Sequence, residues 1–544
     1  MPSNLLINAA RSKAEAEPSA AAYTFYSKHN RPPKRLAWGE LWRTAERIAQ
    51  LLDLPTSASY QGVALVFKDE QMLICCLLGV WIRGATAIPA PVPIGGMGKS
   101  RCQQILSQTM PDIVLTDIPA LNWCEFGIDS KTMVVMGITQ ECIDSSDSLN
   151  LTHNDKIENA DFKPEGPALI QLTSGSTSNP KIISLSFDNL IAGCESIAQA
   201  YSLSAKSVGV HWLPLYHDMG LIGSVVSPLY LGCHSVITRP TVFLQRPLRW
   251  MELISEYRGT ITSAPNFALE MLLDALQKHQ NQNDIHLDLS SITSFILGGE
   301  PVLHQTVNRL LDQLAQFGLK ESAIRPSYGL AEAVLLVSAG GSADGVNWHT
   351  TTTGQKLASC GKPASSVNVT IRHPRPSVSE LERTEGEIWL SGESVGQVIA
   401  FGQDWRQRIA VSEIYSGDYG FFNNGDLHIS GRDATKLIIK GRNIFVEDLV
   451  QSVRDGVGAS GLGGVIAFST FAGGTEVPCI AIESKANLDL RRTNYLLAER
   501  FGIGQVRYFQ LFKDKLIRTS SGKLKHKASG RMILNGDLEA VEIT

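Results

Sequence analysis

The strongest local signal in this sequence is the stretch Leu172-Thr173-Ser174-Gly175-Ser176-Thr177-Ser178-Asn179-Pro180-Lys181. It follows Leu169–Leu172, an apolar run that predicts a buried strand. Small residues let a backbone fold closely around an anion, hydroxyl and N–H groups donate hydrogen bonds, and Lys181 adds a positive charge. It is not a GxxxxGK[ST] loop, because the lysine comes too late and no Ser or Thr follows it. A phosphate-binding loop and a polar surface loop both stay open at this point.

Apolar residues on both sides of this stretch alternate between strand-like runs and helical spacing over the first 340 residues. This succession predicts an α/β fold with parallel sheet and covering helices. The predicted strands are Val63–Phe67, Thr86–Ile88, Ile113–Leu115, Leu169–Leu172, Val208–Leu213 and Phe295–Leu297. The predicted helices are Glu70–Arg83, Lys99–Gln108, Asn189–Ala200, Gly220–Leu231 and Leu303–Gln316.

The pattern changes after Gly340, where Gly, Ser and Thr are frequent and short strands follow at Asn368–Ile371 and Glu387–Leu390. From Asp426 onward, strands and helices alternate again in a piece large enough for a compact α+β domain. We therefore predict a large N-terminal body, residues 1–430, of layered α/β structure with a β-rich subdomain. A small, mobile C-terminal domain is predicted over residues 431–544.

The composition of the 544 residues excludes several classes of protein. A formal net charge of −4 leaves no basic excess to neutralise phosphates, so nucleic acid is not an expected partner. The longest apolar run, Met72–Ile82, is too short to span a bilayer, and the N-terminus has no apolar signal region. Nine scattered cysteines without a CxxC pair favour reduced thiols in a cytoplasmic protein over disulfides or a zinc site.

Four further motifs follow the loop in a fixed order: Tyr328-Gly329-Leu330-Ala331-Glu332, Tyr415-Ser416-Gly417-Asp418, Gly431-Arg432, and Arg518–Lys523. Each is weak alone, but the ordered set resembles the adenylate-forming superfamily of acyl-CoA synthetases, luciferases and peptide-synthetase adenylation domains. The segments His211–Gly223 and Gly299-Glu300-Pro301 narrow the resemblance to fatty acyl-AMP ligases. It extends from about Leu36 to Met532.

This resemblance implies activation of a carboxylic acid, expected to be a fatty acid, by ATP and Mg²⁺. The products are acyl-AMP and pyrophosphate. The acyl group then passes to the phosphopantetheine thiol of an acyl carrier protein, expected in polyketide or nonribosomal peptide biosynthesis. The substrate carboxylate is ionised at pH 7, so the first step needs cations and positioning rather than a general base.

The resemblance also assigns roles to residues of this sequence. The residues expected to hold the β- and γ-phosphates are Thr173, Ser174, Gly175, Ser176, Thr177 and Lys181. The residues expected around the nucleoside are Gly299, Glu300, Tyr328 and Gly329 at the adenine, Asp418 at the ribose, and Arg432 at the ribose or phosphate. Those expected to take part in catalysis or metal binding are Lys523 at the carboxylate and α-phosphate, Glu332 and Thr177 at Mg²⁺, and His217 beside the reacting carboxylate.

Each assignment has a simpler structural alternative. Glu332 could be a solvated carboxylate at a helix start, and Lys523 a tail charge near other lysines, since such residues are mostly exposed. His217 could be a buried histidine that is satisfied by Asp218. The apolar stretch Ser263–Leu273 could be a wall of the acyl site or ordinary core.

The sequence departs from the family pattern where acceptor choice and domain motion are set. Ser178 stands where a glycine is usual. At the joint between the domains, Ala434 stands where Lys or Asp is usual, and Thr435 stands where an acidic residue is usual. The segment Gly341–Ala358 has only 18 residues where fatty acyl-AMP ligases carry an insertion associated with refusing coenzyme A. Val398-Ile399-Ala400 replaces Gly-Tyr-Trp. Two alternatives therefore stay open: an acyl-CoA synthetase, and a degenerate, non-catalytic interaction subunit.

Overall fold

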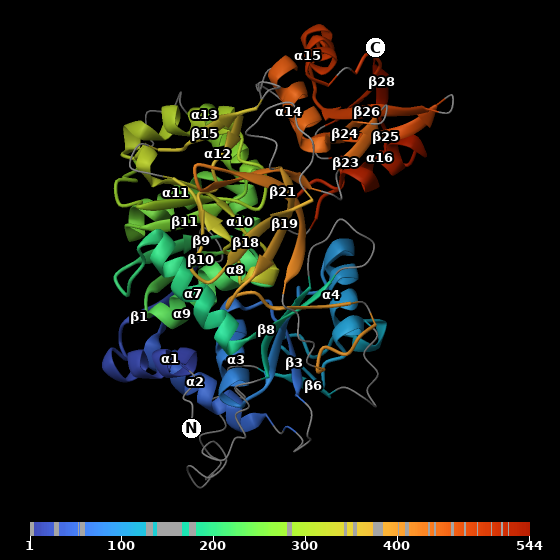
Figure 1. Ribbon diagram of the computed structural model, residues 1–544. Helices are drawn as coiled ribbons and strands as arrows, with labels where there is room; N and C mark the ends of the chain where they lie inside the picture. Colours follow the sequence, from blue (N-terminus) through green and yellow to red (C-terminus); the bar gives the residue numbers. More distant parts are fainter. Residues whose placement is uncertain are drawn as a thin grey trace.

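The computed structural model describes most of the chain. The described residues are 5–26, 32–52, 54, 60–126, 134–138, 166–172, 181–279, 286–341, 345–351, 356–373, 385–400, 402–407, 413–432, 436–439, 442–457, 462–472, 475–486, 488–501, 503–512, 515–519 and 522–543. Two large sheets form the body, and a smaller unit, orange to red in Figure 1, lies at one end of it.

The larger sheet has nine strands in the order β17-β14-β13-β12-β11-β9-β10-β1-β2. Six neighbouring strands run parallel: β1 (Ala21–Tyr26), β9 (Val208–His211), β10 (His234–Thr238), β11 (Ile261–Ala264), β12 (Ser294–Leu297) and β13 (Ile324–Tyr328). The outer strands are antiparallel: β2 (Lys34–Ala37), β14 (Ser338–Ala339) and β17 (Lys362–Pro363). Three helices share a core cluster with the parallel strands: α11 (Leu248–Tyr257), α12 (Asn266–His279) and α13 (His304–Leu314).

The second sheet has seven strands in the order β20-β8-β7-β4-β3-β5-β6. The parallel strands are β3 (Gly62–Val66), β4 (Thr86–Pro89), β5 (Ile113–Thr116), β6 (Val134–Gly137) and β7 (Pro167–Leu172), and the antiparallel ones are β8 (Ile182–Ser186) and β20 (Gln397–Ile399). The largest core cluster joins both sheets through helices α1 (Leu5–Ala16), α2 (Trp38–Leu51), α3 (Glu70–Ile82) and α7 (Phe187–Tyr201). Helix α4 (Gly95–Thr109) packs in a separate cluster with strands of the seven-stranded sheet.

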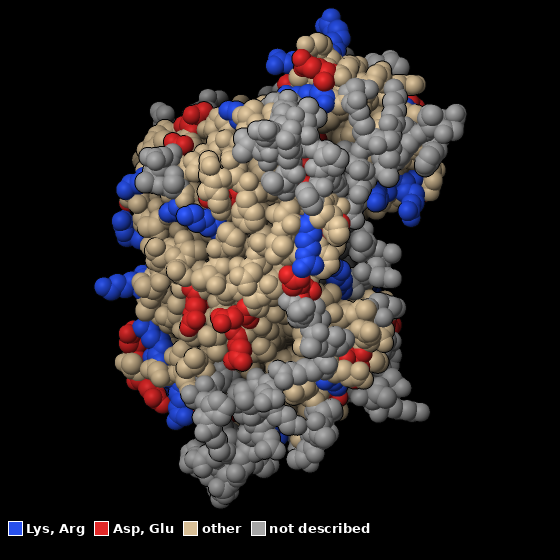
Figure 2. Space-filling model, in the orientation of Figure 1, with Lys and Arg blue, Asp and Glu red and all other residues tan. Residues whose placement is uncertain are grey.

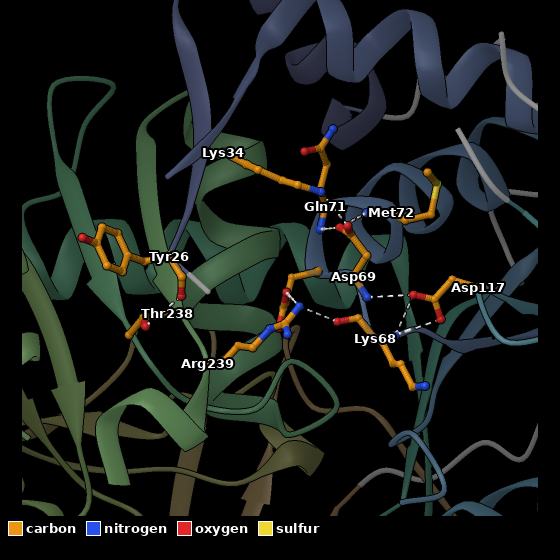
Figure 3. Close-up of polar contacts among 10 residues, drawn as sticks. Tyr26, Lys34, Lys68, Asp69, Gln71, Met72, Asp117, Thr238 and Arg239 are labelled. Atoms are coloured by element: carbon orange, nitrogen blue, oxygen red, sulfur yellow. Dashed lines mark hydrogen bonds and ion pairs between the residues drawn. The ribbon is translucent and has the colours of Figure 1, made fainter. Parts of the chain in front are cut away.

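A polar cluster joins the two sheets where β3 and β5 end (Figure 3). The Asp117 carboxylate accepts hydrogen bonds from the backbone N–H groups of Lys68 and Asp69, at 3.0 and 2.9 Å. Asp69 in turn caps helix α3 by accepting from the N–H of Gln71 at 2.9 Å. Arg239, which precedes α10 (Pro240–Gln245), donates to both carboxylate oxygens of Glu70, at 2.7 and 3.0 Å. These contacts fix the nine-stranded sheet against the start of α3.

A four-stranded antiparallel sheet forms the β-rich part of the body, with β18 (Asn368–Arg372), β19 (Gly386–Ser391), β21 (Ile414–Asn423) and β22 (Asp426–Arg432). The short segment 341–358 contributes a small antiparallel pair, β15 (Trp348–Thr350) and β16 (Lys356–Ala358).

The C-terminal unit is built on a sheet of β25 (Val465–Ala472), β26 (Thr475–Glu483), β27 (Arg507–Leu511) and β28 (Val541–Ile543). Its other elements are β23 (Lys436–Ile439), β24 (Arg442–Phe445), α14 (Val446–Val457), α15 (Arg491–Phe501) and α16 (His526–Leu534). Two hydrophobic clusters consist only of buried residues from Leu437 onward. The exact boundary at 430/431 and the mobility of the unit stay predictions.

The predicted α/β class and the predicted strands and helices are confirmed, with two corrections. The sheets are not purely parallel, because β7 and β8 are joined by only nine residues, 173–181, whereas a parallel crossover needs a dozen or more. The predicted helix Gly220–Leu231 is three consecutive segments: α8 (Asp218–Leu221), a π-helical turn at Ile222–Val226, and α9 (Ser227–Leu231).

Two further expectations can be compared with the described residues. Within these residues, no helix is both long and apolar enough to cross a membrane. The seven cysteines described are all free and buried. On the face shown in Figure 2, acidic and basic side chains are interspersed, and neither sign gathers in one large patch.

Candidate active site

A cavity of about 900 Å³ of empty space, partly open to solvent, lies along the nine-stranded sheet. Its lining includes five of the residues that the sequence singles out, although they are hundreds of positions apart: His217, Gly299, Tyr328, Gly329 and Lys523. The carboxyl ends of parallel strands β9, β11, β12 and β13 meet at this edge, which is where ligands bind in open α/β sheets.

Tyr328, Asp418 and Arg432 form one hydrogen-bonded group beside this cavity. The Tyr328 hydroxyl donates to Asp418 Oδ2 at 2.6 Å, and Arg432 Nε donates to Asp418 Oδ1 at 2.6 Å. Strands β21 and β22 place the last two residues opposite each other in register. Asp418 is 4% exposed, whereas half of the Arg432 side chain is open to solvent. The carboxylate is therefore held in a fixed orientation next to an accessible cation.

The predicted catalytic lysine reaches the same place from the C-terminal unit. Burial lowers the pKa of Lys523, and the positive charge of Arg432 lowers this pKa further. The carboxylates of Asp218, Glu300 and Asp418 oppose that shift and favour the ammonium form. Lys523 is thus a half-buried cation surrounded by carboxylates that come from three separate parts of the body.

The loop that carries Lys523 docks on the body through a glycine. Gly522 has φ +87°, a conformation that L side chains rarely adopt. A methyl group at this position would lie 2.6 Å from Phe267 Cζ, at the start of helix α12. Only a residue without a side chain lets the loop approach the Phe267 ring this closely, so Gly522 sets how far Lys523 enters the cavity.

Glu332 is buried in a tight 3₁₀ turn, Ala331–Ala333, directly after the Tyr328-Gly329 segment. Burial raises the pKa of its carboxyl, and the charges of Lys181 and Arg432 oppose this while Asp218 adds to it. The chain then turns through Val334 and Leu335, whose positive φ values of 47° and 79° are unfavourable for residues with side chains. The sequence gives no sign of this strained turn, which holds the Glu332 carboxylate inside the body.

His217 forms an ion pair with its neighbour, since Nδ1 lies 2.5 Å from Asp218 Oδ1. Burial alone would raise the pKa of Asp218, but the charges of His217 and Lys523 hold that pKa at about 2. Asp218 therefore satisfies the imidazole, and the ring also lines the cavity; the expected role beside the reacting carboxylate stays a prediction.

The remaining candidate residues have a structural partner, belong largely to the core, or lie outside the described part of the chain. Glu300 Oε2 accepts a hydrogen bond from the backbone N–H of Phe267 at 3.0 Å, which gives Glu300 a structural partner. Of the two alternatives for the stretch Ser263–Leu273, ordinary core fits most of it: Leu269, Leu272 and Leu273 are fully buried, and only Ser263 of this stretch lines the cavity. The residues Thr173 to Pro180, and Ala434 with Thr435, lie outside the described part of the chain.

The sequence did not identify most of the apolar wall of the cavity. The wall comes from several elements, mainly α7, the π-helical turn, α9 and β11, and includes Ile197, Tyr201, Pro228, Leu231 and Ile261. A buried pair also lines it: the hydroxyls of Tyr201 and Ser327 share a hydrogen bond of 2.7 Å. Each of these residues is an ordinary apolar or small residue in its own element, so no local signal marks it.

Two mixed sheets, a β-rich subdomain and a small unit whose lysine lines the cavity of the body are the fold of adenylate-forming enzymes. The chain belongs to the AMP-binding enzyme family, whose model matches residues 10–399.

Relatives and solved structures agree with this membership. A 4-hydroxyphenylalkanoate adenylyltransferase of Mycobacterium tuberculosis is 28% identical and covers 97% of this chain and 90% of its own length. The medium-chain-fatty-acid–[acyl-carrier-protein] ligase JamA of Moorena producens is 29% identical and covers 82% of this chain and 80% of its own length.

A structure from work on fatty acyl-adenylate ligases of E. coli and L. pneumophila covers 98% of both chains, with 24% identity and a TM-score of 0.78. A structure of McyG A-PCP with phenylalanyl-adenylate covers 98% of this chain and 83% of its own, with 20% identity and a TM-score of 0.79. These two likenesses concern the fold.

Proposed function

We propose that this enzyme joins a carboxylic acid, expected to be a fatty acid, to ATP to form acyl-AMP and pyrophosphate, and then transfers the acyl group to a phosphopantetheine thiol. The observation that carries the proposal is the convergence of Lys523 with the Tyr328–Asp418–Arg432 group at one apolar cavity. This convergence supports a role for Lys523 as the cation between the carboxylate proposed to bind the ribose and the apolar space proposed for the acyl chain.

The residues fit the physical demands of acyl-AMP formation. Two anions must approach each other, so Lys523 would neutralise the acid carboxylate and the α-phosphate together. Asp418 would accept hydrogen bonds from the ribose hydroxyls, with Tyr328 beside the adenine and Arg432 holding the carboxylate in place. His217 would border the entering carboxylate as a positioning group. None of these steps requires a side-chain nucleophile.

Glu332 would hold the Mg²⁺ that accompanies ATP, together with Thr177. Burial raises the pKa of the Glu332 carboxyl, because a buried negative charge is unfavourable. A hard cation bound at this carboxylate would offset that cost. Bound Mg²⁺ would supply charge neutralisation for the phosphates. Lys181, whose charge reaches Glu332, would assist there.

The second step is proposed to use an acyl carrier protein rather than coenzyme A. Two relatives support this choice by their names, the JamA ligase and the McyG A-PCP structure. The short segment 341–358, whose described residues include the β15–β16 pair, favours coenzyme A as the competing acceptor. We expect mass spectrometry to detect acyl product on a holo-carrier protein and none on coenzyme A. Product on coenzyme A alone would reverse the assignment.

ATP–pyrophosphate exchange across a panel of carboxylic acids tests the first step and the third alternative. Exchange with at least one acid is expected. A folded protein that binds ATP but exchanges with no acid would instead be a non-catalytic subunit.

The free, buried cysteines support a reducing compartment, and we infer a cytoplasmic location from them.

Gly522→Ala should lower ATP–pyrophosphate exchange by about 10- to 100-fold, because a methyl group would push the lysine loop away from Phe267. Gly536→Ala is the matched control: Gly536 has a similar φ of +80° but no atom within 4 Å of an added methyl group. The double variant Gly522→Ala/Phe267→Ala should recover part of the lost exchange. Equal losses in Gly522→Ala and Gly536→Ala would mean that backbone strain, and not the approach to Phe267, causes the effect.

A further inference from the structure

One polar group in the wall of the cavity has no role in the proposed chemistry. His211 is the last residue of β9, is 4% exposed and lines the cavity. Its Nδ1 is buried and has no hydrogen-bond partner among the described residues. The ring lies over Gly209, where an added methyl group would come within 2.4 Å of Nε2, so this glycine gives the imidazole its place in the wall. A buried polar group without a partner is unfavourable, which calls for an explanation.

The charge state of His211 limits what it can bind. Burial lowers the pKa of the imidazole to about 4, so the ring is neutral near pH 7. A neutral imidazole offers one N–H donor and one acceptor nitrogen and does not attract a second carboxylate. A hydroxyl group, which both donates and accepts, is the substrate group that fits it best.

The strand register places this imidazole away from the reacting end of the cavity. Gly209 pairs with Ile261, so His211 is level with Ser263 on β11, and Ser263 pairs with Ile296 on β12. His211 and Ile296 are two strands apart, which is about 10 Å at roughly 4.8 Å per strand. Gly299, where an added methyl group would lie 3.9 Å from Lys523 Nζ, follows Ile296 by three residues. A hydroxyl on the carbon next to the carboxylate would stay near Lys523 and would not reach His211.

We propose that the acid activated by this enzyme carries a hydroxyl group several carbons from its carboxylate, and that this hydroxyl hydrogen-bonds to His211. The inference rests on the proposed activation of a carboxylic acid and adds the substrate class. The cavity then selects hydroxylated acids over their unsubstituted counterparts, with the Ser263 hydroxyl on the neighbouring strand as a second polar group at the same level. His211 is in this view a specificity-determining residue and takes no part in the reaction itself.

The test compares matched acids on the full-length enzyme. The probes are straight-chain acids of increasing length, each with its ω-hydroxy and its α-hydroxy counterpart, and phenylpropanoate with its para-hydroxy counterpart. The wild type should exchange ATP and pyrophosphate with the best distal hydroxy acid at a kcat/KM at least about 10-fold above that for its unsubstituted counterpart. His211→Leu should reduce this ratio to about one or below, and the α-hydroxy acids should show no preference in either protein.

A control and a second measurement separate selectivity from stability. Ser338→Ala removes a fully buried hydroxyl that also lacks a partner among the described residues but does not line the cavity, so it should keep the wild-type ratio. Replacing His211 by leucine should leave the melting temperature unchanged or raise it, because no hydrogen bond to a described residue is lost. A lower melting temperature with an unchanged ratio would overturn the proposal and make the imidazole structural.

Calorimetric binding of the same acids distinguishes this inference from the proposed function. If no acid supports exchange but a distal hydroxy acid binds more tightly to the wild type than to His211→Leu, the proposed activity fails, and only the His211-dependent preference for a distal hydroxyl in binding stands. If exchange occurs with equal kcat/KM for hydroxylated and unsubstituted acids, the activity stands and the inference is wrong. Neither exchange nor His211-dependent binding would reject both.

Discussion

Lys523→Ala should lower acyl-AMP formation by about 1,000-fold or more while leaving the fold intact. The substrate carboxylate and the α-phosphate repel each other, and Lys523 is the cation that the C-terminal unit brings into the cavity between the surrounding carboxylates. Its removal leaves that repulsion uncompensated at the moment of attack. ATP–pyrophosphate exchange measures the first step, and thioester formation from supplied acyl-AMP measures the second.

The second step should stay near wild-type rate, because it starts from an adenylate that already exists. Lys527→Ala is the matched control: this lysine is four residues further on, in helix α16, and is exposed. It should keep both activities. Equal loss of both steps in Lys523→Ala would mean that the lysine supports the structure and has no specific task in adenylation.

Asp418→Ala should lower kcat/KM for ATP by about 100-fold or more, since hydrogen bonds to a charged group contribute roughly 1.5–3 kcal/mol each. The change removes the acceptor proposed for the ribose hydroxyls and also the partner of Tyr328 and Arg432. Initial rates of exchange at varied ATP concentration measure the effect. The cost in stability should be modest, because half of the Arg432 side chain is open to solvent and water can replace its partner.

Asp418→Asn separates the shape of this side chain from its charge. The amide keeps one oxygen for Tyr328 or Arg432, so activity between those of the wild type and Asp418→Ala is expected. Asp288→Ala, which removes an exposed aspartate 3.1 Å from Arg258, should leave ATP kinetics unchanged. An unchanged kcat/KM for ATP in Asp418→Ala would exclude this carboxylate from nucleotide binding.

Hydrophobic periodicity in the sequence predicted most of the helices and strands, because it depends only on residues that are close together in the chain. The buried strand β3 and helix α3 differ from their predicted bounds by one residue at most. The same patterns missed α1, although its buried residues Leu6, Ala10 and Ala14 recur with the four-residue spacing of a helix face. They also missed the antiparallel edges of both sheets, because apolar periodicity marks a strand without giving its direction.

The ordered motifs by themselves determined the class of enzyme, since a short segment such as Tyr328–Glu332 keeps its residue types and spacing wherever it folds; the residues that they assign to the nucleotide stay a prediction. Only the tertiary structure decided the contacts between segments: the partners of Asp418, the close approach of Gly522 to Phe267, and the composition of the cavity wall. His211 is an unremarkable residue at the end of a strand until residues of β11, β12, β13 and the π-helical turn join it in the wall of one cavity. A cavity wall depends on side chains that are far apart in the chain, so no local pattern can specify what the cavity selects.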